Sequence, residues 1–147
     1  MAHADLIDSL IGTYRGLNLT IRPIANEQAA TAGASGKSLL SVLADLRAQE
    51  LATSQQLKNM TMAAGQTGEV AIPEPFNDQD VRVLLSEFGT AREAILALVR
   101  NMSDEQLDME RTARDGTTTI RAVVQGLAER DQQVLAEINS FIPAARV

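Results

Sequence analysis

Three charged residues interrupt rows of apolar residues in this sequence, and their types could support acid–base or ionic chemistry. Glu50, Arg92 and Asp131 each lie seven positions after one apolar residue and seven before another, which places each in the core-facing row of a helix. Two acids and one base near the middle of such rows could meet inside a helical bundle, where an unpaired charge is costly. The flanking residues are Leu43 and Leu57, Leu85 and Val99, and Val124 and Ile138.

These three charges admit two interpretations, and the sequence leaves both open. In the first, burial and the nearby arginine displace the pKa values of the two acids, and the group forms a ligand pocket or a general acid–base site. In the second, the charges satisfy one another as a structural ion cluster, or lean toward solvent near the helix ends. Asp45 and Arg130 lie at the edges of the same rows and are interpreted as solvated.

The composition excludes several kinds of site and partner. The chain has 147 residues, no Cys and a single His, His3, so thiolate chemistry, histidine triads and His-ligated metals are excluded by count. A net charge of -6 without a cluster of Lys or Arg predicts that nucleic acid is not a partner. The opening MAHADLIDSL does not resemble a signal peptide, and no run of about eighteen apolar residues occurs. We therefore expect a cytoplasmic protein with no membrane partner.

Four stretches with apolar residues at helical spacing must position the three charges. Hydrophobic residues make up 45% of the chain and aromatic residues only 3%, a mixture that favours helix over strand. The expected helices span 6–21, 39–60, 77–102 and 120–138, with start signals at Ser38 and Asn77, a short extra turn at Ser103 and a stop at Pro143. Helices of this length must bury their apolar faces against one another. The sequence thus predicts one all-α domain over 1–147, an antiparallel four-helix bundle.

The sequence resembles the DinB/YfiT superfamily in three segments. They are 38–50 (SLLSVLADLRAQE), 102–108 (MSDEQLD) and 116–131 (GTTTIRAVVQGLAERD). The resemblance covers nearly the whole chain and implies a four-helix bundle that is commonly a homodimer. It also implies a divalent metal, which active members bind through one His of the second helix and two of the fourth. Some members use this metal to activate a thiol such as mycothiol or bacillithiol.

The metal ligands of that superfamily have no histidine counterpart in this chain. The second-helix ligand matches Asp45, and the fourth-helix pair matches Arg130 and Val134, within one residue. Asp45 could ligate a metal, but a valine cannot and an arginine would repel one. The Trp that often precedes the second helix is replaced by Gly36 or Lys37. The resemblance therefore implies the fold without the family's metal, and we expect no metal and no cofactor.

Three hypotheses for the function follow. The one we favour is a DinB-like homodimer without catalytic activity, which binds a small molecule or another protein and holds Glu50, Arg92 and Asp131 as a polar cluster. The second is a thiol-dependent transferase or isomerase that works without metal, or with Asp45, Glu50 and Asp131 as oxygen ligands for a hard metal. The third is a purely structural partner whose exposed helix faces are the functional surface.

Overall fold

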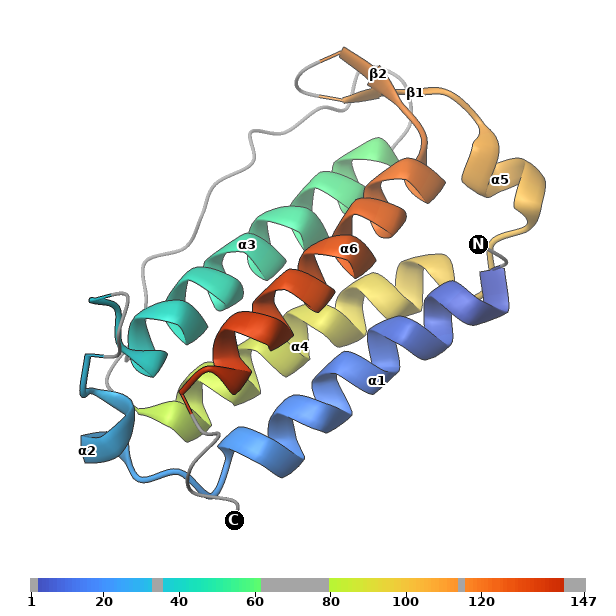
Figure 1. The fold of residues 1–147 in the computed structure, drawn as a ribbon. Coiled ribbons are helices and arrows are strands. Elements are labelled where there is room, and N and C mark those ends of the chain that lie inside the picture. The colour runs from blue at the N-terminus through green and yellow to red at the C-terminus, as the bar shows by residue number, and fades with distance from the viewer. Residues whose placement is uncertain (1–2, 33–35, 62–79, 114–115, 142–147) are drawn as a thin grey trace.

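The computed structural model describes residues 3–32, 36–61, 80–113 and 116–141, and most of them are helical (Figure 1). The long helices within these ranges are α1 (His3–Ile21), α3 (Leu39–Met60), α4 (Val81–Val99) and α6 (Ile120–Asn139). The shorter elements are the helices α2 (Asn26–Ala29) and α5 (Asp104–Asp108) and the paired strands β1 (Arg111–Ala113) and β2 (Gly116–Thr118). The predicted all-α class is confirmed, and the small hairpin is an addition that the sequence did not predict.

Polar side chains cap the N-termini of α3, α4, α5 and α6. The Ser38 hydroxyl accepts from the Ser41 backbone N–H at the start of α3, and the Thr119 hydroxyl accepts from Ala122 at the start of α6. Ser103 forms a capping box with Gln106, which confirms the short helical turn expected there. Asn77, the expected start of the third long helix, lies outside the described residues. That helix begins instead at Val81.

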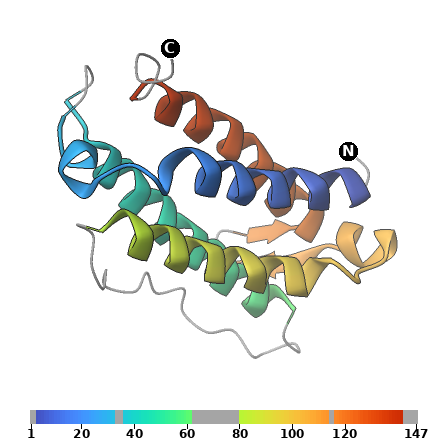
Figure 2. The same cartoon turned by 90° about the horizontal axis from the view of Figure 1, so that it is seen from below.

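The relative directions of the long helices differ from a fully antiparallel bundle. Residues 47 and 50 of α3 pair with residues 87 and 92 of α4, so these two helices run parallel. Helix α1 lies between α4 and α6 in Figure 2; it is antiparallel to α4 and parallel to α6. The physical reason is connection length, because the 20 residues between Met60 and Val81 can span up to about 66 Å. A connection that returns along the length of a 19-residue helix, so that the next helix starts at the same end, needs to span only about 28 Å.

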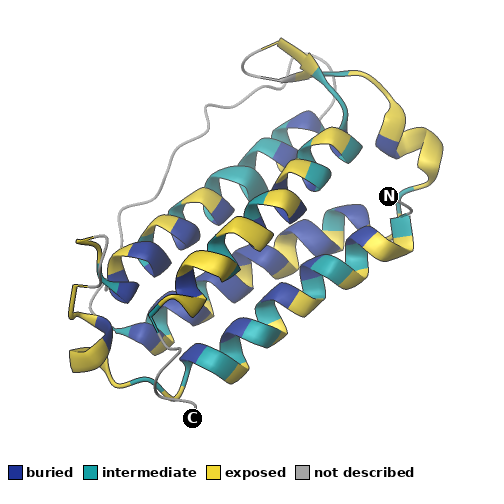
Figure 3. Cartoon of the chain, in the orientation of Figure 1, coloured by how far each residue is buried: buried dark blue, intermediate teal, exposed yellow. Residues whose placement is uncertain are grey.

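Two apolar clusters fill the interior, one toward each end of the long helices. The first contains Leu46 and Phe88, and the second contains Leu57, Ile95 and Leu127. Figure 3 shows the buried positions following the inward faces of all four long helices. The three charges predicted from the sequence fall between the two clusters along α3, α4 and α6, so the interior is apolar, then charged, then apolar.

Helix α5 and the β1/β2 hairpin lie at the end of the bundle where α4 finishes, whereas α2 lies at the other end (Figure 1). Leu107 of α5 is buried in the second apolar cluster. Arg121 of α6 donates to Asp108 (2.6 Å) and Asp104 (2.9 Å) of α5, and these hydrogen bonds raise the pKa of Arg121 above its ordinary value. This contact ties α5 to the start of α6. Across the described ranges, no helix is both long and apolar enough to cross a membrane.

Candidate functional site

Arg92 is the centre of a buried ion cluster in which every guanidinium N–H has an acceptor. Nη1 donates to Asp131 Oδ2 (2.8 Å) and to the Leu10 carbonyl (3.0 Å), and Nη2 donates to Glu50 Oε1 (3.1 Å) and Asp131 Oδ1 (3.0 Å). Nε donates to Glu50 Oε2. These contacts use all five donors of the guanidinium. The arginine is therefore fully satisfied without water.

All four long helices contribute to this cluster. Glu50 comes from α3, Arg92 from α4, Asp131 from α6, and the Leu10 carbonyl from α1. The three side chains are at most 1% exposed. The Phe88 ring, one helical turn before Arg92, lies 4.9 Å from the guanidinium carbon and adds a cation–π contact. One guanidinium group thus links all four long helices near the middle of their length.

Burial by itself lowers the pKa of Arg92, because a charge in an apolar interior loses its hydration. The hydrogen bonds that Arg92 donates to Asp131 and Glu50, with the negative charges of the same two groups, outweigh this loss and raise the pKa of Arg92 above its ordinary value. Arg92 is therefore a fixed cation at every physiological pH. It cannot act as a general acid or base.

Arg130 is a fourth member that the sequence analysis did not assign to the cluster. Its Nη2 donates to Glu50 Oε1 (2.6 Å) and lies 3.8 Å from Asp131 Oδ1, with the side chain 20% exposed. Two arginines then balance two carboxylates, so the cluster carries no net charge. The sequence did contain a signal for this role of Arg130, its position directly beside Asp131. A base next to a buried acid can reach that acid's neighbours in the cluster, here Glu50 of α3.

The arrangement answers part of the question that the sequence left open. Each carboxylate of the cluster holds the Arg92 guanidinium through both of its oxygens, and Glu50 also holds Arg130. A general base needs a lone pair directed at a substrate, and a catalytic acid needs a proton to give. The geometry of Glu50, Arg92 and Asp131 is that of a satisfied structural ion cluster.

The positions that match the family's metal ligands lie in three different environments. Asp45 is exposed on α3, five positions before Glu50 and so about 140° around the helix from it. Arg130 is engaged with Glu50, and Val134 is half-buried against the first apolar cluster. These residues do not fit a metal. In the ranges that the structure describes, no three His, Asp or Glu side chains are grouped to hold one.

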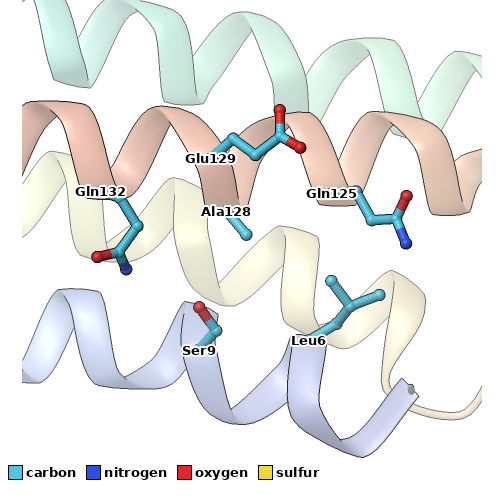
Figure 4. A pocket seen from close by; sticks show the side chains of 6 residues that line it. All are labelled: Leu6, Ser9, Gln125, Ala128, Glu129 and Gln132. Carbon is cyan, nitrogen blue, oxygen red and sulfur yellow. The ribbon is translucent and has the colours of Figure 1, made fainter. Parts of the chain in front are cut away.

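A second feature is a groove between α1 and α6, with a volume of about 480 Å³. In Figure 4, Leu6 and Ser9 of α1 reach toward α6, and Ala128 and Gln132 of α6 reach toward α1. Gln125 lies along the α6 side of the same groove, and Glu129 lines it from the outer side of α6 with its carboxylate turned away from α1. Apolar carbon at the base and amide, hydroxyl and carboxylate groups around it form a surface suited to a small organic molecule.

Comparison with known proteins adds no assignment to these observations. No family model matches this chain, and no curated protein matches it. The function must therefore be argued from the cluster and the groove themselves. The cluster explains how the four helices are held, and the groove is the larger of two hollows that the described residues line with room for a ligand.

Proposed function

We propose that this chain is a four-helix bundle of the DinB/YfiT type without a metal site, and that it acts as a small-molecule-binding module without catalysis. The observation that carries the proposal is the engagement of Arg130, at a position matching a family ligand, with buried Glu50 (2.6 Å). A cation held there takes the place that a metal would need. The second matching position, Val134, has only carbon atoms in its side chain and cannot coordinate a metal.

The groove between α1 and α6 is the proposed binding site. Its volume of about 480 Å³ falls in the range of small-molecule sites, which is about 300–1,000 Å³. Apolar lining from Leu6 and Ala128 supplies affinity, and the polar groups of Ser9, Gln125 and Gln132 supply orientation. None of these residues belongs to the ion cluster, so a ligand could bind without disturbing it.

Filling the groove is expected to abolish ligand binding without unfolding the protein. Ser9 is half-buried and lines the groove, so Ser9→Phe places a ring in the space that a ligand would occupy. A fragment library screened by ligand-observed NMR should give hits with the wild type and lose them with Ser9→Phe. The matched control is Ser86→Phe, at an exposed position of α4, which should keep every hit. Hits that survive Ser9→Phe would locate binding elsewhere.

Metal content separates this proposal from the thiol-transferase alternative. Protein purified without tag or chelator is expected to hold well under one equivalent of nickel, zinc or manganese by elemental analysis, even after soaking. The reason is that the two buried carboxylates are already held by guanidinium groups and Asp45 is on another face of α3. A near-stoichiometric metal would mean that carboxylates had replaced the histidines, and would favour the transferase.

The homodimer implied by the resemblance, and the cytoplasmic location, stay predictions. Leu19 of α1 is 76% exposed, so it can be changed without disturbing the core and serves as a probe of such a dimer. Sedimentation equilibrium of the wild type and of Leu19→Lys tests the dimer. A monomeric wild type would contradict the predicted homodimer.

A further inference from the structure

The charge around the α1/α6 groove is negative. Glu129 is the charged residue among those that line the groove, and it makes no ion pair within the described parts of the chain. Asp5 is exposed one turn before Ser9, on the same face of α1, and adds a second negative charge beside the groove. The net charge of the whole chain, -6, reinforces this potential.

Two basic residues of α6, Arg121 and Arg130, do not offset these acids. Arg121 precedes Gln125 by one turn on α6, but its guanidinium is held by Asp104 and Asp108 of α5. Arg130, also on α6, is directed to Glu50 on the opposite side of the helix. The described residues that line the groove include no Lys or Arg, so a carboxylate or phosphate there would meet like charge, whereas an ammonium would meet opposite charge.

The apolar part of the groove sets a second requirement. Leu6 is 1% exposed and Ala128 is 6% exposed, so their carbon atoms form a base that water does not solvate well. A fully hydrated cation would gain nothing from this base. A molecule with a short apolar body and one cationic end would bury the body and keep the charge at the rim.

We propose that the α1/α6 groove binds a small amphipathic amine, with its apolar body against Leu6 and Ala128 and its ammonium group beside Glu129. The proposal rests on the proposed function, because it names the ligand class for the same groove. Ser9, Gln125 and Gln132 provide a hydroxyl and two amides that accept the remaining ammonium hydrogens. The smaller polar pocket near α2 is a weaker candidate, because Asp80 there already caps α4 and Asn26 accepts from Val81.

Three probes with the same carbon chain and different charge test the proposal: n-hexylammonium, 1-hexanol and hexanoate. Each is titrated into nitrogen-15-labelled wild-type protein, and the backbone amide shifts of Leu6, Ser9 and Gln125 are followed. Hexylammonium is expected to bind tightest. Glu129→Gln is expected to weaken it about fivefold, the value of one exposed ion pair, and added salt should weaken it as well.

Glu137→Gln is the matched control, since Glu137 is another exposed acid of α6, two turns beyond Glu129 and rotated away from the groove. It should leave hexylammonium binding unchanged. Equal or tighter binding of hexanol or hexanoate would overturn the amine and keep the proposed function. If no probe binds but Ser9→Phe still removes fragment hits, only the amine is overturned. If the fragment screen is also empty, the proposed function falls with it.

Discussion

Replacing Arg92 by leucine is expected to lower the free energy of unfolding by about 3–5 kcal/mol, the cost of removing one partner from a buried ion pair. The change leaves Glu50 and Asp131, both 0% exposed, with Arg130 as their remaining cationic partner. It also leaves the Leu10 carbonyl without its donor. Chemical denaturation followed by circular dichroism measures the loss.

A triple variant tests whether the loss comes from stranded charge. Arg92→Leu combined with Glu50→Leu and Asp131→Leu should recover much of the stability, because well-packed apolar residues often replace a buried ion cluster without loss. Arg130 then loses its partner, but at 20% exposure it can turn to water. Arg82→Leu, at an exposed position of the same helix, should change stability by less than about 0.5 kcal/mol. An Arg92→Leu variant as stable as the wild type would exclude the cluster.

Substituting alanine for Gly89 is the second change expected to have a large effect. Gly89 is buried in α4, and a Cβ added there would lie 2.6 Å from Tyr14 Cε1 of α1, closer than real Cβ atoms approach. The Tyr14 ring cannot withdraw freely because it packs against Phe88, with ring centroids 6.0 Å apart. We expect Gly89→Ala to destabilise the protein by about 1–3 kcal/mol, the usual cost of overpacking a core.

Gly126 supplies the matched control for this experiment. It is exposed on α6 and no atom lies within 4 Å of an added Cβ, so Gly126→Ala should stabilise the protein by about 0.5–1 kcal/mol through helix propensity alone. Thermal melts of both variants show whether each substitution raises or lowers the melting temperature. Combining Gly89→Ala with Tyr14→Ala should remove most of the clash. A stabilising Gly89→Ala would show that α1 moves away from α4 at little cost.

The placement of the buried charges could be predicted from sequence because heptad spacing reports which face of a helix a residue occupies. Seven positions correspond to nearly two helical turns, so an apolar residue before and after Glu50 puts that carboxylate in the core. Spacing also fixed the extents of the long helices to within a few residues. It could not assign Arg130, since a half-buried side chain at the edge of a row has the same spacing as a solvated one.

The relative directions of neighbouring helices could not be predicted, because hydrophobic periodicity shows which face of a helix is buried and not which helix packs against it. An apolar row on α4 packs equally well against a parallel or an antiparallel neighbour. The groove was missed for a different reason. Its space comes from small residues on the two facing helices, Ser9 on α1 and Ala128 on α6. Small residues on one helix face were the signal that could have indicated it.

The ion cluster takes groups from all four long helices, and this has a consequence for protein synthesis. Glu50 and Asp131 are 81 positions apart, so at about 5–20 residues per second the ribosome adds the second acid roughly 4–16 s after the first. Arg92 is added 39 positions before Asp131, so for roughly the last 2–8 s of that interval Glu50 is the one acid of the cluster already made, and the faces that α6 will cover are open to water. The domain can close only after translation has delivered α6, so the emerging chain exposes its apolar rows and is a natural client for chaperones.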